Sequence, residues 1–280
     1  NDIHALLQDI STKHGITIYA THTGKNVYGV DLGSPAFTSL QKPDVLLVAG
    51  SGISSSQCGE IWHLLDWHYD IDVSLVEKNR LGAIDLFQYN VIIMPNGAYS
   101  DVDSSTVTAL KRWIRRGNTL IAFGSAIRWA HDQRLGHFPK VADPSTQKKP
   151  LIRRPYAARV EELGSRRMTG AIFEINLDLT HPLAFGYSHD KLPVFQTSTS
   201  VLELSANPYS TPGVYSAQPL LSGYVPQGSI ERIANKAAIV TDKVGAGRVI
   251  AFENNVTFRA FWYGTNKLLA NAIFFGQIID

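Results

Sequence analysis

Two side chains in this sequence could act as nucleophiles at places where an α/β protein would use one. Ser125 follows Gly124 directly after the mostly apolar run 119–123, and Cys58 lies in the first turns of a helix expected to begin near Ser54. A sharp strand-to-helix turn presents a nucleophile at the top of a sheet, and a helix N-terminus stabilises a thiolate. Ser125 and Cys58 are therefore the first candidate catalytic residues.

The neighbours of both candidates favour a structural role. The pattern Gly-x-Ser-x-Gly is absent around Ser125, because Phe123 and Ile127 stand at the two glycine positions. A small residue on a tight turn commonly serves the backbone. Cys58 falls on the apolar face of its helix, and free cysteine is among the most buried residue types. The sequence predicts that neither residue is catalytic, with an amidase or esterase using Ser125 or Cys58 as an alternative.

Small and amide-bearing residues follow four of the expected strands. In open parallel sheets a ligand lies beyond the carboxyl ends of the strands, where backbone donors and helix N-termini can bind a carboxylate, an amide or a sugar. Turn formation alone would also select such residues. The candidate binding crevice, for a peptide or glycan ligand, consists of Ser51, Gly52, Asn96, Gly97, Gly124, Ser125, Asn254 and Asn255.

The elements that would position these residues alternate between strands and helices. Short continuous apolar runs indicate strands buried on both faces, and apolar residues at helical spacing separate them. This alternation predicts an α/β fold, a mostly parallel sheet with helices on both faces, amidotransferase-like or flavodoxin-like. The expected strands are 45–49, 72–76, 91–94 and 119–123, and the expected helices are 54–68 and 101–116.

The C-terminal half is predicted to be richer in strands. Gly245-Ala246-Gly247 is interpreted as a hairpin turn, because the helix that a dinucleotide site requires does not follow it. A closing helix is expected at 265–277. The expected strands of this half are 171–177, 194–197, 201–204, 237–241 and 249–252.

Three segments differ in character along the chain. Residues 1–43 are expected to form a leader packed on the main fold, with a short helix near 5–10 and a strand at 16–20, and residues 44–280 form the main domain. A basic insertion at about 131–168 interrupts that domain. Between Lys140 and Arg167 it holds eight Lys or Arg against three acids. A long proline-rich insertion of this kind is either a solvated excursion or a lid.

Composition excludes several classes of function. A net charge of +2 gives no support for a nucleic-acid partner, and no apolar run is long enough for a membrane span. A single cysteine excludes an internal disulfide and any multi-cysteine metal site. The chain begins at Asn1, which indicates a processed or excised piece.

Two stretches carry a resemblance to a known family. Residues 58–66 read Cys-Gly-Glu-Ile-Trp-His-Leu-Leu-Asp, and residues 249–266 run from Val249-Ile250-Ala251-Phe252 through Glu253-Asn254-Asn255 to Asn266. Both resemble the C-terminal region of bacterial carboxypeptidase-A-like zinc peptidases, which is itself similar to a class I glutamine amidotransferase domain. The resemblance covers roughly residues 1–280. It implies an exported, periplasmic or extracellular protein with a peptidase-like domain upstream as the partner of this chain.

This chain departs from both parts of that family. None of its nine histidines has a glutamate three residues later, as the family's zinc site requires, so no metal or cofactor is expected here and zinc only in the upstream domain. The turn after residue 123 has no cysteine, and His181-Pro182-Leu183 has leucine where the family's his-pro-glu pair has the carboxylate that orients the base, which leaves His181 a fallback candidate.

These departures predict a non-catalytic accessory domain that positions the peptidase-like domain or contacts its substrate or a partner. A stand-alone amidase or esterase is one alternative. A glycan-binding module at the strand-end crevice is the other.

Overall fold

The computed structural model describes residues 2–137, 141–142, 153, 155–226 and 228–280. The chain forms two compact units, Asn1–Ser39 and Leu40–Asp280. The boundary therefore falls four residues before the expected one. The part of the basic insertion at 138–140, 143–152 and 154 lies outside the described residues.

The first unit contains one helix, α1 (Ile3–His14), among its described residues. The carboxylate of Asp2 caps it by accepting hydrogen bonds from the backbone nitrogens of His4 and Ala5, and Gly15, with φ of 63°, ends it. The strand expected at 16–20 is wrong, because these residues pair with no other strand. A strand without a partner cannot satisfy its backbone groups. The packing of the leader on the main fold stays a prediction.

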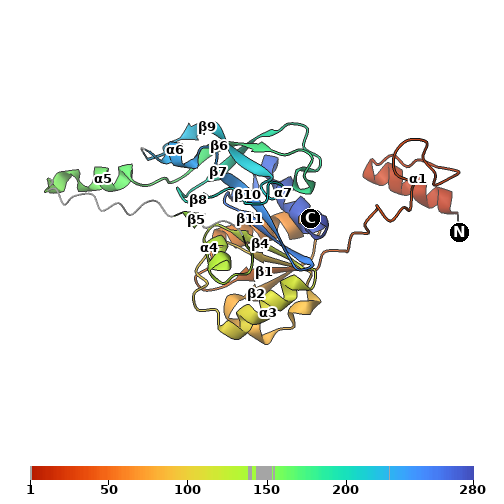
Figure 1. Ribbon diagram of the computed structural model, residues 1–280, viewed down its shortest axis with the longest axis horizontal. Coiled ribbons are helices and arrows are strands. Elements are labelled where there is room, and N and C mark those ends of the chain that lie inside the picture. The colour runs from red at the N-terminus through yellow and green to blue at the C-terminus, as the bar shows by residue number, and fades with distance from the viewer. Residues whose placement is uncertain (1, 138–140, 143–152, 154, 227) are drawn as a thin grey trace. The chain divides into compact units, whose positions relative to one another are not determined.

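The second unit is built on one large sheet (Figure 1), to which the described residues contribute eleven strands. One half is parallel and carries the apolar runs that the sequence predicted. The side chains of the four inner strands are buried on both faces, which explains why their runs are continuous rather than alternating, whereas the edge strand 73–77 has no buried residue. The parallel strands lie in the order β2 (Val73–Glu77), β1 (Val45–Ala49), β3 (Val91–Met94), β4 (Thr119–Phe123) and β11 (Gly247–Phe252).

The other half of the sheet is antiparallel. Strand β11 joins the halves, because it is parallel to β4 on one side and antiparallel to β10 on the other. The predicted hairpin is confirmed, since Val244 pairs with Gly247 across the turn. The antiparallel strands continue in the order β10 (Ala237–Val244), β9 (Gly213–Gly223), β6 (Ala171–Leu177) and β7 (Lys191–Gln196). The short strand β8 (Val201–Leu202) also pairs with β10, and β5 (Val141–Ala142) pairs with β8.

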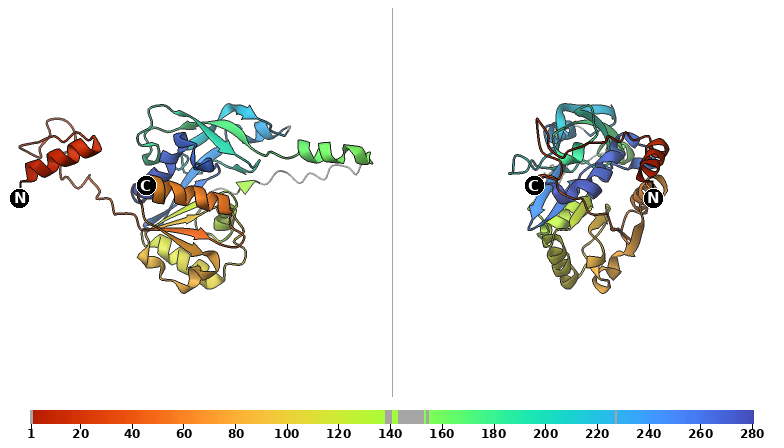
Figure 2. Two further views of the ribbon diagram at one scale, coloured as in Figure 1. Left: turned by 180° about the vertical axis from the view of Figure 1, so that it is seen from behind. Right: turned by 90° about the vertical axis from the view of Figure 1, so that its right-hand side faces the viewer.

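Helices cover both faces of the parallel half (Figure 2). Helix α2 (Ser55–Trp62), its π-helical continuation His63–His68, and α7 (Tyr263–Phe275) contribute apolar side chains to one buried cluster. Helices α3 (Ser104–Arg115) and α4 (Ser125–Asp132) contribute theirs to a second cluster. The two clusters use alternate residues of the same strands, so they lie on opposite sides of the sheet. The predicted α/β fold with a mostly parallel sheet is therefore present.

Sequence pattern located most of these elements. Four strands, β1, β3, β4 and β6, match the predicted bounds to the residue, and the predicted helix at 101–116 is found as Ser104–Arg115. Strand β9 was missed, and so were α5 (Arg159–Ser165) and α6 (Ser229–Ile233). Helix α5 lies within the predicted basic insertion, and none of its residues is buried. No helix in the described part of the chain is long and apolar enough to span a membrane.

Candidate functional site

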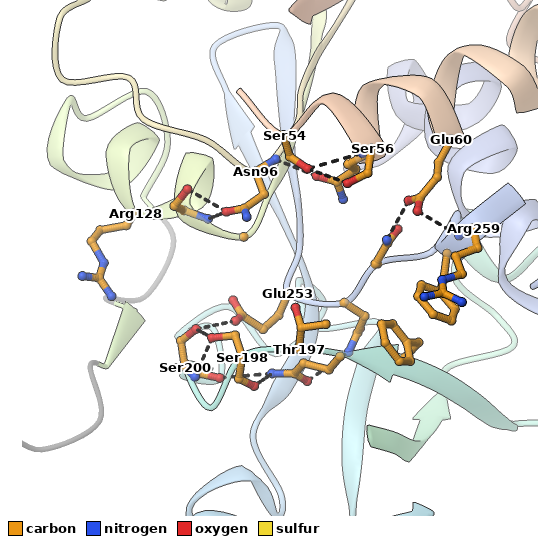
Figure 3. Close-up of a pocket in the computed structure, with 18 residues that line it drawn as sticks. Ser54, Ser56, Glu60, Asn96, Arg128, Thr197, Ser198, Ser200, Glu253 and Arg259 are labelled. Carbon is orange, nitrogen blue, oxygen red and sulfur yellow. Dashed lines mark hydrogen bonds between the residues drawn. The ribbon is translucent and has the colours of Figure 1, made fainter. Parts of the chain in front are cut away.

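A polar cavity of about 770 Å³ opens at the carboxyl ends of the parallel strands (Figure 3). Strands β3, β4 and β11 end at its wall, and the N-terminal turns of α2 and the loop after β7 complete it. Five of the eight crevice residues predicted from sequence line the cavity, whereas Ser51, Gly52 and Gly97 do not. The lining residues are Ser54, Ser56, Gln57, Glu60, Asn96, Gly124, Ser125, Arg128, Phe195–Ser198, Ser200, Glu253–Asn255, Phe258 and Arg259.

The turn from β4 into α4 has the form of a nucleophile elbow, but glycine occupies its strained position. Gly124 has φ of 53° and ψ of −121°, a conformation that a residue with a side chain rarely adopts. A Cβ atom at Gly124 would lie 2.8 Å from Oδ1 of Asn96. The residue that the turn presents most directly to the cavity therefore has no side chain with which to attack a substrate.

Ser125, one residue further on, lines the cavity with its hydroxyl fully engaged. Its Oγ donates to Oδ1 of Asn96 at 2.7 Å or to the carbonyl oxygen of Gly97 at 2.6 Å, and it accepts from the backbone nitrogen of Gly97 at 2.9 Å. None of the described lining residues is a histidine. A serine nucleophile needs a base within hydrogen-bond reach, and the cavity wall supplies no imidazole to Ser125.

Cys58 does not line this cavity. Its side chain is 8% exposed and packs in the second apolar cluster, and its Sγ donates to the carbonyl oxygen of Val48 at 3.4 Å. Burial raises the pKa of the thiol to about 11. The environment of Cys58 thus favours the unreactive thiol over the thiolate.

His181 also lies outside the cavity wall. It caps a short 3₁₀ turn, where its Nδ1 accepts a hydrogen bond from the backbone nitrogen of Leu183 at 3.1 Å. Burial lowers the pKa of the imidazole, and the negative charge of Asp178 opposes this effect only in part. Of the three fallback catalytic candidates, the structure places only Ser125 at the cavity.

Glu253, which was not among the candidate residues predicted from the sequence, is the acid of the cavity whose pKa is shifted. Its side chain is 6% exposed; Oε1 accepts from the hydroxyl of Ser200 at 2.9 Å, and Oε2 has no hydrogen-bond partner among the described residues. Burial raises its pKa to about 7, against the hydrogen bond from Ser200 and the positive charge of Arg128. The sequence feature that could have identified Glu253 is its position directly after the predicted strand 249–252.

A buried hydrogen-bond network supports the wall next to Glu253. The hydroxyl of Tyr215 donates to Oε1 of Gln196 and accepts from Nδ2 of Asn254 at 2.6 Å. Nε2 of Gln196 then donates to the carbonyl oxygens of Ser198 at 2.7 Å and Ser200 at 3.3 Å. These bonds fix the loop that carries the hydroxyl partner of Glu253.

The carboxylate of Glu60, the second acid of the cavity, is already hydrogen-bonded to other groups of the protein. Its Oε2 accepts from Nδ2 of Asn255 at 2.7 Å, and its Oε1 accepts from the backbone nitrogen of Arg259 at 2.9 Å. Arg259 and Ala260 both adopt positive φ, at 50° and 56°. Glu60 therefore holds a strained loop at the rim of the cavity. Among the described residues, no group of three or more His, Cys, Asp or Glu could hold a metal ion.

Comparison with solved structures defines the class of fold. PurLQS from Thermotoga maritima has a TM-score of 0.51 and 13% identity, with 82% of this chain and 97% of that chain covered. A GMP synthase subunit from Thermoplasma acidophilum has a TM-score of 0.50 and 9% identity, with 83% and 94% covered. A ThuA-like protein from Parabacteroides merdae has a TM-score of 0.54 and 12% identity, with 85% and 90% covered.

These likenesses show a class I glutamine amidotransferase-like α/β fold. At such low identity they concern the fold alone. The sequence matches no protein-family model and no curated protein.

Proposed function

We propose that this chain is a ligand-binding domain with an amidotransferase-like fold and without hydrolytic chemistry of its own. The observation that supports this most strongly is Gly124, because the strained position of the elbow holds no side chain and a Cβ would contact Asn96. The hydroxyl of Ser125 is engaged in hydrogen bonds, and the thiol of Cys58 is buried outside the cavity.

The cavity itself supports a binding role. Its wall is rich in serine, asparagine and glutamine side chains and carries two arginines and two glutamates. Such a wall can recognise a polar ligand by hydrogen bonds, and its volume is within the range of small-molecule sites. A glycan is a second candidate ligand beside a peptide, because the hydroxyl, amide and guanidinium groups of the wall supply hydrogen-bond donors and acceptors for sugar hydroxyls.

The proposal for the wider biological role rests on the resemblance of residues 58–66 and 249–266. We infer an accessory domain of an exported zinc-carboxypeptidase-like protein, periplasmic or extracellular, with the zinc in an upstream peptidase-like domain. In that role the cavity would contact a substrate or partner of the upstream domain. The coding sequence upstream of Asn1 tests this, with a continuing frame that contains His-x-x-Glu and a later histidine as the supporting result.

The absence of chemistry is tested by a hydrolase screen. The purified chain is incubated with glutamine, peptide amides and nitrophenyl esters, and released ammonia or nitrophenol is measured. We expect no turnover above buffer. Turnover that is abolished by Ser125→Ala or Cys58→Ala would overturn the proposal and favour a stand-alone amidase or esterase.

Binding is tested by thermal unfolding with panels of peptides and glycans. A ligand at 100 times its Kd stabilises the folded chain by about 2.7 kcal/mol. We expect at least one compound to raise the Tm, and Asn254→Ala to remove the effect. The matched control is Asn207→Ala, an exposed asparagine that does not line the cavity. If no compound in either panel raises the Tm, the binding role fails.

A further inference from the structure

Two buried acceptor atoms at the end of β11 lack partners in the described part of the chain. They are Oε2 of Glu253 and Oδ1 of Asn254, whose residues are 6% and 2% exposed and both line the cavity. Buried polar atoms are nearly always hydrogen-bonded in folded proteins. Two unpaired acceptors on consecutive residues of one cavity wall therefore point to a ligand that brings hydrogen-bond donors.

The hydrogen bonds around Asn254 determine which of its side-chain atoms has no partner. The hydroxyl hydrogen of Tyr215 is used on Gln196, so this hydroxyl can only accept from Asn254. It receives that bond from Nδ2 of Asn254 at 2.6 Å, and the same nitrogen lies 3.5 Å from Oε1 of Gln196. The amide orientation is thereby assigned, and the carbonyl oxygen of Asn254 is the unpaired group.

The charges around Glu253 indicate what kind of donor is needed. The hydroxyl of Ser200 donates one neutral hydrogen bond to the carboxylate of Glu253. The positive charge of Arg128, on α4, also favours the ionised carboxylate, but by less than burial disfavours it. The charge of this carboxylate also acts on Tyr215, on β9, and raises the pKa of the phenol beyond the effect of burial. An ionised carboxylate in such a place is costly to bury unless a cation pairs with it.

We propose that the cavity binds its ligand through a protonated primary amine, with Glu253 Oε2 and Asn254 Oδ1 as the acceptors. A hydroxyl group would donate one hydrogen bond and bring no positive charge. An ammonium group donates three hydrogen bonds and brings a positive charge into direct contact with the carboxylate. This inference rests on the proposed binding function and names the chemical group that the site selects.

The remaining lining suits a ligand whose other groups are polar. Hydroxyls of Ser56, Thr197 and Ser198 border the cavity and are exposed. They can meet sugar hydroxyls or peptide groups equally well, so the amine could belong to an amino sugar or to a peptide N-terminus. The shared feature is the ammonium group, and the experiment separates the two sources.

The test uses two matched pairs of probes in titration calorimetry at pH 7. D-glucosamine is compared with D-glucose, and alanyl-alanine amide is compared with its N-acetylated form. We expect the amine of one pair to bind at least tenfold more tightly than its neutral partner, and the pair identifies the source. At pH 5.5 the carboxyl group of Glu253 holds a proton, so binding weakens roughly tenfold, since an ammonium pairs with the ionised form.

Two variants isolate the carboxylate. Glu253→Gln keeps the shape and the acceptor for Ser200 but removes the charge, so we expect it to abolish both the amine preference and the pH effect. Glu231→Gln, at an exposed position of α6 that does not line the cavity, should change neither. Equal affinity for amine and neutral partner, a preference that survives Glu253→Gln, or no binding by all four probes would overturn the inference. The proposed binding function is tested independently, by thermal unfolding with the panels of peptides and glycans described above.

Discussion

Oδ1 of Asn96 accepts a hydrogen bond from the backbone nitrogen of Ser125 at 2.9 Å, and the hydroxyl of Ser125 lies within hydrogen-bond distance of the same oxygen, at 2.7 Å. Asn96 follows β3 and Ser125 begins α4 after the neighbouring strand β4. The pair therefore ties together the ends of two adjacent strands at the place where an enzyme of this fold class would hold its nucleophile. A catalytic serine needs a free hydroxyl, whereas this one joins two loops.

Ser125→Ala is expected to lower stability by about 1–2 kcal/mol. The substitution removes the hydroxyl that accepts from the backbone nitrogen of Gly97 and leaves that donor without its bond. Urea unfolding measures the loss, and Ser55→Ala, at an exposed position on the same edge of the fold, should stay within about 0.5 kcal/mol of the parent. Unchanged stability in Ser125→Ala would argue that the hydrogen bonds of Ser125 are not its role.

Gly124→Ala is expected to be more disruptive than its size suggests. A methyl group would lie 2.8 Å from Oδ1 of Asn96, in a backbone conformation that costs a non-glycine residue about 1–3 kcal/mol. Gly59→Ala is the matched control, because a Cβ there meets nothing within 4 Å and Gly59 lies within α2. That control should gain about 0.5–1 kcal/mol. Equal stability of both variants would contradict the strained elbow.

Strands that are buried on both faces could be predicted from the sequence, because such a strand appears as a continuous run of apolar residues. Strand β9 was not, since its eleven residues include Pro219 and several exposed positions. It becomes a strand through pairing with β6 and β10, a property of the assembled sheet. Intrinsic preference is a weak guide for such antiparallel strands.

The candidate site divides in the same way. Crevice residues such as Asn96 and Asn254 were predicted because each lies two residues after the end of a strand. The strained backbone of Gly124 could not be predicted, because it depends on φ and ψ. The full set of lining residues could not be predicted either, because it depends on which strand ends become neighbours. Strand β11 lies beside β4 although the two are far apart in the chain, and this pairing brings Glu253 to the cavity.

Cys58 is expected to react with a disulfide reagent only when the chain unfolds. Burial raises the pKa of its thiol to about 11, so about 0.1% is thiolate at pH 8. Labelling of the native chain should be roughly a hundredfold slower than in guanidinium chloride, where the one thiol of the chain reacts completely. Rapid labelling of the folded chain would return Cys58 to the candidate nucleophiles.

Glu253 is expected to make the chain less stable as the pH rises. Its pKa is raised from 4.5 to about 7 in the folded state, so the folded chain holds the proton more tightly than the unfolded chain. The stabilising contribution of the protonated form is complete below pH 4.5 and is lost as the pH rises through 7, a change of about 3 kcal/mol. Glu253→Gln cannot ionise and keeps an acceptor for Ser200, so its free energy of unfolding should exceed that of the parent increasingly between pH 4 and pH 8.

Urea unfolding at several pH values measures the difference, with Glu231→Gln as the control for loss of an exposed carboxylate. Parallel stability profiles for the parent and Glu253→Gln would show that the carboxyl group ionises at its ordinary pKa, and would remove the basis for an unpaired charge in the cavity.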